Sequence, residues 1–155
     1  QGHRAICEFL LDHGAEADAQ DARGRSALAM ACAYGRRRVV QLLMHRGADP
    51  RCPDSRGRTA FHLACCCDDP RVALIMLQCR PALELEKQAD EDGRTGLHYA
   101  VLNPHVKQRP MIIDLLLRSS AEPHAVDKCG KPPLWYAVEA QCAHEAALLL
   151  RHRTR

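Results

Sequence analysis

The chain has 155 residues, with 22 Lys and Arg against 19 Asp and Glu, so its net charge is +3. That mild charge does not favour nucleic acid as a partner, because basic nucleic-acid-binding domains usually carry a clustered patch and a higher pI. The longest apolar runs are far too short to span a bilayer, so we expect no membrane segment. Only 4% of the residues are aromatic, so the core must consist of Leu, Ala, Val, Ile and Cys.

Nine cysteines are many for this length. Their number is odd, no C-x-x-C pair occurs and three are consecutive, which fits neither a disulfide framework nor a zinc site. We therefore expect reduced, metal-free thiols in a cytoplasmic or nuclear protein. Cys32 and Cys65 occupy core offsets, whereas Cys66 and Cys67 fall on the outward face of a predicted helix and should be accessible.

The same pattern occurs four times, as GRSALAMACAYG from Gly24, GRTAFHLACC from Gly57, GRTGLHYAVLN from Gly93 and GKPPLWYAVEA from Gly130. A leucine-rich block follows each copy. The glycines are 33, 36 and 37 residues apart, so a 33-residue unit carries three extra residues once and four extra residues once. A fixed period predicts a stack of similar units, whose function lies on a surface rather than in a catalytic pocket.

In chain order, the units form one domain over 1–155. We assign a partial unit to 1–20, full units to 21–53, 54–89 and 90–126, and an incomplete unit to 127–155. The first segment provides only a second helix, and the last stops before an exit motif. We therefore expect a fragment of a longer array.

The unit that begins at Asp54 shows how the residues form helices. Asp54 and Gly57 predict a tight turn in which glycine supplies a positive φ. Thr59 can then cap a first helix over 60–67, and Pro70 opens a second helix, because Pro is tolerated in a first turn. Each unit is thus a turn, a helix, a second turn, a second helix and an extended return.

These residues resemble the ankyrin repeat, whose pattern is D-x-x-G-x-T-P-L-H-x-A, then I-V-x-L-L-L and a G-A-D-x-N exit. The matching positions are Asp54, Gly57, Thr59, His62 and Ala64, and again Gly93, Thr95, Leu97, His98 and Ala100. The resemblance covers the whole chain and implies an all-α ankyrin-repeat solenoid of helix-turn-helix units with short β-turn or hairpin fingers. It also implies that the two histidines tie neighbouring turns together by hydrogen bonds.

The chain departs from that pattern in four places. Ser26 and Ala29 replace Thr and His in the unit over 21–53, so we expect its histidine network to be missing. Trp135 stands where His is usual in the last unit. The segments over 78–89 and 103–110 are three and four residues too long. We expect both to be mobile surface loops that tolerate shortening, because added loop length costs little.

The chain contains no G-x-S-x-G, P-loop or H-E-x-x-H motif. His62 and His98 could be interpreted as general bases, but their role in joining neighbouring turns by hydrogen bonds is the stronger interpretation. We therefore expect a non-enzyme with no catalytic residue, no metal and no cofactor.

A basic residue follows the turn glycine in every unit, and we call this row the basic ladder: Arg25, Arg58, Arg94 and Lys131. Arg23, Arg56 and Lys128 add positive charge beside it, and Glu91 and Asp92 interrupt it. An acidic or phosphorylated peptide would bind such a row through bidentate hydrogen bonds. The alternative is a solvated row paired with local acids. We expect that Arg58→Glu with Arg94→Glu leaves the fold intact.

Further contact residues are expected at the exposed ends of the first helices, beside the ladder: Tyr34, Cys66, Leu102 and Asn103. Tyr34 and Leu102 are apolar enough to anchor a partner. Trp135 either contacts a partner or covers the end of the array.

The resemblance thus implies a monomeric module that binds another protein or peptide, acidic or phosphorylated, in a concave groove. It would be the scaffold or targeting part of a larger protein. One alternative is the substrate-recognition array of a ubiquitin-ligase adaptor. Another is nucleotide or oligonucleotide binding, which would need Trp135, Tyr34 or Tyr136 stacked beside Arg or Lys.

Overall fold

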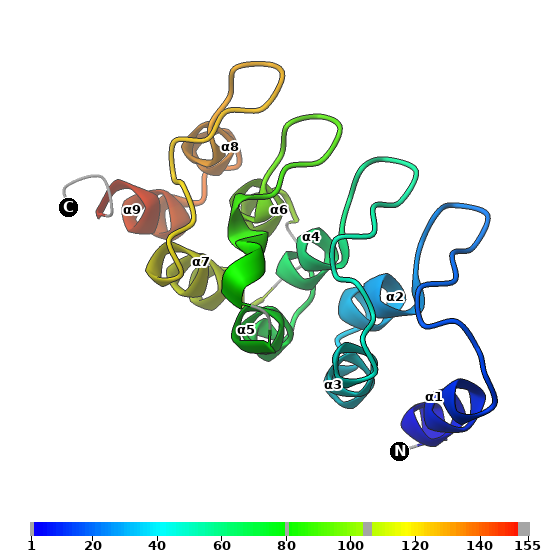
Figure 1. Ribbon diagram of the computed structural model, residues 1–155. Helices are drawn as coiled ribbons and strands as arrows, with labels where there is room; N and C mark the ends of the chain where they lie inside the picture. Colours follow the sequence, from blue (N-terminus) through cyan, green and yellow to red (C-terminus); the bar gives the residue numbers. More distant parts are fainter. Residues whose placement is uncertain (1, 80, 104–106, 152–155) are drawn as a thin grey trace.

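The computed structural model describes residues 2–79, 81–103 and 107–151, and the regular structure in these ranges is helical (Figure 1). The helices are α1 (Gly2–Asp12), α2 (Ala27–Ala33), α3 (Arg37–His45), α4 (Ala60–Cys65), α5 (Pro70–Cys79), α6 (Gly96–Leu102), α7 (Arg109–Arg118), α8 (Pro133–Glu139) and α9 (Ala143–Arg151), with 3-10 turns η1 (Pro81–Leu83) and η2 (Leu85–Lys87). Within the described ranges, every helix is too short to cross a membrane.

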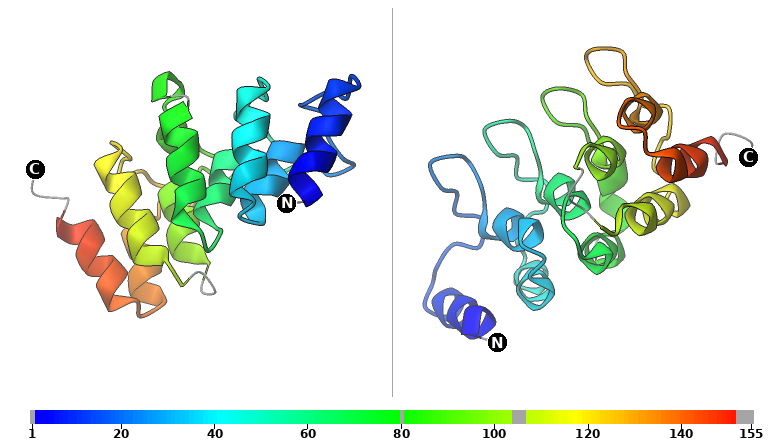
Figure 2. Two further views of the ribbon diagram at one scale, coloured as in Figure 1. Left: turned by 90° about the horizontal axis from the view of Figure 1, so that it is seen from below. Right: turned by 180° about the vertical axis from the view of Figure 1, so that it is seen from behind.

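After α1, the helices form the pairs α2–α3, α4–α5, α6–α7 and α8–α9, which stack into a curved array (Figures 1 and 2). We call α2, α4, α6 and α8 the first-row helices. The chain before each of them projects as a finger, and all fingers lie on the same side of the array. They are finger 1 (20–26), finger 2 (53–59), finger 3 (89–95) and finger 4 (126–132). This arrangement confirms the predicted all-α solenoid.

Helices α4 and α6 pack closely because α6 begins with a glycine where it meets α4. Phe61 and Cys65 of α4 are fully buried, and α6 packs directly onto them. A Cβ added to Gly96, the first residue of α6, would lie 2.9 Å from Cys65 Sγ and 3.2 Å from Phe61 Cε1. The glycine therefore allows α6 to approach α4, and Cys65 serves as a small core residue as its offset predicts.

The fingers are joined to one another through their backbones. Ser55 N donates to Arg23 O over 3.0 Å, Glu91 N to Arg56 O over 3.2 Å, and Lys128 N to Asp92 O over 2.8 Å. Gly24 has φ of 72°, and a Cβ there would lie 2.9 Å from Ser55 N. Glycine is thus needed both for the turn and for the close approach of the next finger.

The insertion between finger 2 and finger 3 lies largely at the surface, as predicted for 78–89, but it is not an irregular loop, and one of its residues packs into the core. The segment forms η1 and η2 instead. Leu85, at the start of η2, is only 1% exposed and belongs to the main core. Glu84 turns the chain with φ of 45° and pairs with Lys87 at 2.7 Å. The additional residues thus place one apolar side chain, that of Leu85, in the core.

The second insertion, over 103–110, is described only at its flanks, and residues 104–106 lie outside the described part of the chain. Asn103 Nδ2 donates to Cys66 O over 3.0 Å, and Lys107 N donates to Asp68 Oδ1 over 3.0 Å. Both flanks therefore attach to the α4–α5 turn. The expected mobility of this loop remains a prediction.

Candidate partner-binding surface

Each finger is shaped by one aspartate at its base. Asp21 Oδ1 accepts from Arg23 N and Arg25 N, both over 2.9 Å. The same pair of backbone bonds recurs at Asp54, Asp90 and Asp127. One carboxylate oxygen thus closes each turn, and the fingers differ in what binds the other oxygen.

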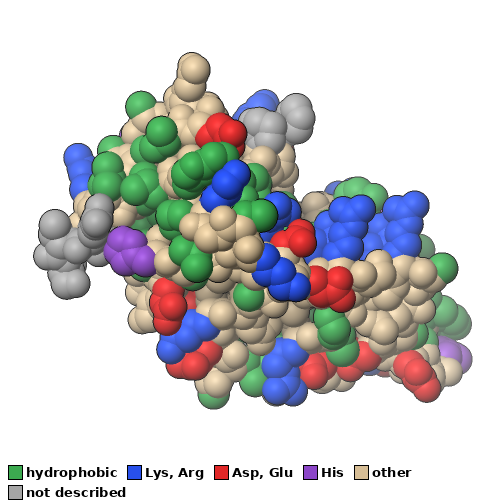
Figure 3. Space-filling view, turned by 90° about the horizontal axis from the view of Figure 1, so that it is seen from above, with side chains coloured by type: hydrophobic (Ala, Val, Ile, Leu, Met, Phe, Trp, Pro, Cys, Tyr) green, Lys and Arg blue, Asp and Glu red, His purple; other side chains and the backbone are tan. Residues whose placement is uncertain are grey.

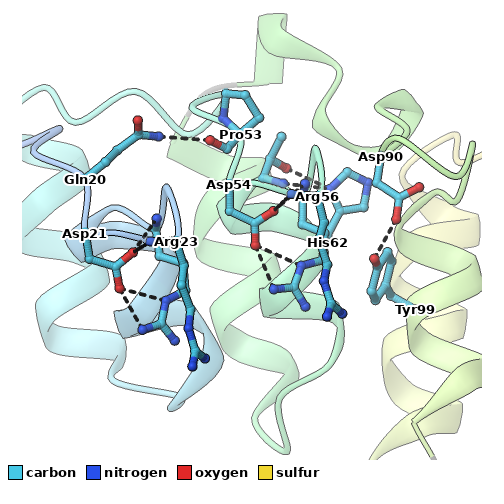
Figure 4. Close-up of polar contacts among 12 residues, drawn as sticks. Gln20, Asp21, Arg23, Pro53, Asp54, Arg56, His62, Asp90 and Tyr99 are labelled. Atoms are coloured by element: carbon cyan, nitrogen blue, oxygen red, sulfur yellow. Dashed lines mark hydrogen bonds and ion pairs between the residues drawn. The ribbon is translucent and has the colours of Figure 1, made fainter.

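In fingers 1 and 2, the ladder arginine binds that second oxygen (Figure 4). Arg25 donates through Nε and NH2 to Asp21 Oδ2 over 2.9 and 2.6 Å. Arg58 contacts Asp54 Oδ2 at 2.9 and 2.7 Å. The Arg25 hydrogen bond lowers the pKa of Asp21 to about 2. Burial acts to raise the pKa of Asp54, but hydrogen bonds from Arg58 and two backbone N–H groups lower it.

These two ladder members are therefore neutralised within their own fingers, as in the alternative interpretation of the row. Asp54 is only 7% exposed. Arg58→Glu would set a second carboxylate against it, so the geometry favours a destabilised fold over the intact fold expected from the sequence. Uncompensated buried charge is among the costliest effects of single substitutions.

In fingers 3 and 4, a tyrosine hydroxyl binds the second oxygen. Tyr99 OH donates to Asp90 Oδ2 over 2.6 Å. Tyr136 OH donates to Asp127 Oδ2 over 2.5 Å, and this hydrogen bond is the main cause that lowers the pKa of Asp127. The ladder residue of each finger is consequently displaced from the aspartate of its own finger.

The displaced residues find other partners. Arg94 NH1 lies 3.3 Å from Asp92 Oδ2, and Arg94 Nε lies 4.0 Å from Asp127 Oδ2. Lys131 Nζ lies 3.5 Å from the ring centroid of Trp135, a cation–π distance. The four ladder residues therefore do not form a row of four equivalent free cations.

The residue four positions after each helix cap decides between these arrangements, and sequence reasoning missed it. Fingers 3 and 4 are followed by Tyr99 and Tyr136 at that place, whereas Met30 and Leu63 occupy it after fingers 1 and 2. Among Met, Leu and Tyr, only the tyrosine hydroxyl can donate a hydrogen bond to the aspartate. The sequence does contain this information, because a tyrosine occurs at the same position of the last two units.

Arg23 and Arg56 are the available cations of fingers 1 and 2. Both are exposed, and neither forms an ion pair with any carboxylate in the described part of the chain. They stand at corresponding places on successive fingers (Figure 4). Seen from the finger side, hydrophobic side chains gather over the C-terminal half, whereas Lys and Arg side chains lie on both halves with Asp and Glu side chains among them (Figure 3).

The two histidines hold neighbouring units together, as the resemblance implies. His62 Nδ1 accepts from Thr59 N over 3.0 Å, so its Nε2 carries the proton and donates to Gln88 O over 3.1 Å. His98 Nδ1 likewise accepts from Thr95 N at the end of finger 3 over 3.1 Å, and its Nε2 donates to Lys131 O of finger 4 over 3.1 Å. Burial lowers the pKa of both rings, which favours the neutral form.

The unit that lacks this histidine uses other links. Ser26 caps α2 by accepting from Ala29 N over 3.2 Å. Gln20 Nε2 donates to Pro53 O over 2.9 Å, which joins fingers 1 and 2 through a side chain (Figure 4).

Three of the predicted contact residues are exposed apolar groups. Tyr34 is 66% exposed, Trp135 37% and Leu102 36%. Tyr34 ends α2, Leu102 is the last residue of α6, and Trp135 lies in the first turns of α8. They are spread along the first-row helices from one half of the array to the other.

Cys66 and Asn103, which are also predicted to contact a partner, join adjacent units of the array. Asn103 donates to Cys66 O, and Cys66 Sγ lies 3.8 Å from Tyr99 O. Burial raises the pKa of Cys66 to about 12. Cys67 is 4% exposed, so the expectation of accessible thiols is wrong for it. Helix α4 ends at Cys65, and the next two residues fold back in a turn rather than continuing the predicted helix face.

Two family models match the chain. One, described as ankyrin repeats in many copies, matches residues 10–64, and the other, described as an ankyrin repeat, matches residues 92–128. Within the described residues, no group of His, Cys, Asp or Glu is placed to hold a metal ion.

Proposed function

The chain belongs to the ankyrin-repeat family, and from this premise we propose that it binds a partner protein or peptide in the concave groove between its fingers and its first-row helices. Ankyrin repeats are generally protein–protein interaction modules. The proposal adds where a partner binds on this chain and which side chains meet it.

The exposed aromatic groups are the observation that carries this proposal. The chain has only three Tyr, two Phe and one Trp. Even so, Tyr34 and Trp135 lie exposed on first-row helices, with Leu102 on another. Aromatic and aliphatic groups that become buried on binding supply much of the free energy of association.

The finger backbones favour binding in a second way. Each finger is closed by its aspartate and bonded to the next finger through backbone groups. Groups that are already ordered lose little conformational entropy when a partner binds, and preorganisation therefore raises affinity.

An acidic or phosphorylated partner is the finer form of the proposal. Arg23 and Arg56 support it, because their guanidinium groups are exposed and outside the ion pairs of their fingers. A guanidinium can bind a carboxylate or a phosphate with two parallel hydrogen bonds. We further propose that the array is the scaffold or targeting part of a larger cytoplasmic or nuclear protein, where its free cysteines would stay reduced.

Binding of a nucleotide is a second candidate, favoured by one observation. Lys131 lies against Trp135, which places an aromatic ring beside a cation as such a site requires. Titration with nucleotides should shift the fluorescence of this single tryptophan if the site is real. An unchanged spectrum up to millimolar nucleotide would exclude it.

Selection from a random-peptide library tests the main proposal. Peptides selected on the whole chain should lose about tenfold or more in affinity on Tyr34→Ala with Trp135→Ala, because interface anchors of this kind contribute over 1 kcal/mol each. Met111→Ala is the matched control, since Met111 is 59% exposed on α7, away from the first row. Equal binding to all three proteins would contradict the groove as the site.

A further inference from the structure

The tips of the fingers carry a defined order of charges. The residue two positions after each closing aspartate is Arg23, Arg56, Asp92 and then Cys129. These tips are true neighbours, because the carbonyl oxygens of the first three each accept from an N–H group of the next finger. A partner lying across the fingers therefore meets these side chains in this order.

The first two tips are positive and available. Arg25 and Arg58 are held by the aspartates of their fingers, which leaves Arg23 and Arg56 exposed and outside any ion pair of the described chain. Arg23 and Arg56 are therefore better placed to bind an anion than Arg25 and Arg58, since a guanidinium with two N–H groups already directed at a carboxylate oxygen has fewer donors left for a ligand.

The third tip reverses the charge. Glu91 and Asp92 are both exposed, and Arg94 lies 3.3 Å from Asp92. Glu91 forms no ion pair with a cation of the described chain, and its Cγ lies 2.7 Å from where a Cβ of Gly57 would be. Its side chain thus rests on the turn of finger 2. The boundary between basic and acidic tips falls between finger 2 and finger 3.

We propose that the groove selects a peptide whose charge changes sign along its length, with carboxylates or phosphates opposite Arg23 and Arg56 and a Lys or Arg opposite Glu91. This rests on the proposed function. A peptide of one sign would meet repulsion either at Arg23 and Arg56 or at Glu91, and like charges at an interface cost affinity and exclude wrong partners.

The spacing of the fingers sets the spacing of those charges. Helices that pack in contact lie about 8–10 Å apart, and an extended chain advances about 3.3 Å per residue. Neighbouring fingers therefore correspond to steps of about three residues in the peptide. The expected pattern is two acidic positions about three residues apart, followed by a basic one within about three residues, because the Glu91 side chain lies against the turn of finger 2.

Charge-swap variants test this with the same random-peptide library. The parent chain should enrich the mixed pattern. Arg23→Glu with Arg56→Glu should weaken the selected peptides about tenfold or more and shift a new selection to basic residues at the first two positions. Glu91→Lys with Asp92→Lys should replace the basic position by an acidic one. Arg38→Glu with Arg71→Glu is the matched control, because it changes the net charge equally on α3 and α5.

The source of the anionic charge is decided with the selected peptides themselves. Versions with glutamate and with phosphoserine at the first two positions are compared, and tighter binding of either supports the proposal and identifies that group. Affinity should fall as salt rises, because exposed charge pairs are screened.

Failure of this inference can be told apart from failure of the proposed function. Peptides that need Tyr34 and Trp135 but show no charge pattern, or that stay acidic opposite finger 3, would overturn the inference and leave groove binding in place. A library that yields no peptide dependent on these two aromatic residues would overturn both. A loss on the control variant equal to that on the tip variant would show a nonspecific charge effect and also overturn the inference.

Discussion

Fingers 1 and 2 differ from fingers 3 and 4 although their backbones follow one plan. In both halves an aspartate closes the turn with two backbone bonds. Its remaining oxygen binds an arginine in the first half and a tyrosine hydroxyl in the second. A residue on the neighbouring helix therefore decides whether the ladder cation stays in its finger. Equivalent positions of a repeat need not have equivalent chemistry.

The two arrangements also differ electrostatically. The second finger holds a charged pair, Arg58 with the largely buried Asp54. The fourth finger satisfies Asp127 with the neutral Tyr136 and leaves Lys131 to stack on Trp135. Removing Arg58 should therefore matter more than removing Lys131, because it would leave the buried carboxylate of Asp54 without its partner.

The largest effect is expected at the junction between the halves. Leu85→Ala should lower the free energy of unfolding by about 2–5 kcal/mol, since it removes a fully buried side chain from the core. Chemical denaturation measures it, with Met111→Ala as the exposed control that should stay within about 0.5 kcal/mol of the parent. A comparably small loss at Leu85 would mean that the segment is the surface loop which its length suggested.

The next effect sharpens the comparison of the fingers. Arg58→Ala should destabilise the chain by about 1–3 kcal/mol, because Asp54 would keep only its backbone donors in a buried place. Arg94→Ala should cost less, since Tyr99 and Tyr136 continue to bind Asp90 and Asp127. Both changes in the free energy of unfolding follow from the denaturant midpoints, provided that the denaturant dependence (m) is the same in each variant. The reverse order would show that the tyrosines do not replace the arginines.

A smaller effect is expected from the tyrosine itself. Tyr99→Phe should cost about 1 kcal/mol, because Arg94 can take the vacated oxygen of Asp90 as its counterparts do in fingers 1 and 2. Arg94→Ala should then cost more in the Phe background than in the parent. A double-mutant cycle measures this coupling. Strict additivity of the two changes would contradict the exchange of partners.

The smallest effect at neutral pH concerns the histidines, whose rings link units in the middle and C-terminal part of the array. Burial lowers the pKa of His62 and His98 below the ordinary value of 6.5. The unfolded chain therefore binds more protons below that pH, so stability is complete above about 6.5 and declines as pH falls. Unfolding measured at constant ionic strength from pH 8 to pH 5 should show a plateau and then a decline. A flat profile would mean that both rings protonate freely in the fold.

Much of the fold could be predicted because its signals are local. The glycines of the turns, the caps at Thr59 and Thr95, and the apolar stripes lie within single units. The histidine links were anticipated through the family resemblance. The end of α4 was misplaced by two residues, which put Cys67 on an outward face when it is buried. Helix ends depend on the packing of the following turn, which periodicity alone does not reveal.

The candidate surface was predicted less well than the fold. The exposed positions of Tyr34, Leu102 and Trp135 were anticipated. The assignment of Asn103 and Cys66 to binding stays a prediction, and the structure adds that both join adjacent units. A polar group at the end of a short helix can hydrogen-bond to a partner or to the next repeat. The distance between stacked repeats decides which of the two it reaches.

The sequence by itself determined the repeat, the order of the helices and the family, because each follows from residues close together along the chain. Only the tertiary structure decided which group binds the second oxygen of each closing aspartate, and hence which arginines remain available. That choice depends on Tyr99 and Tyr136 reaching aspartates nine residues away. It also decided that the extra residues before finger 3 bury Leu85. Burial is settled by the neighbours that surround a side chain, and these come from separate units.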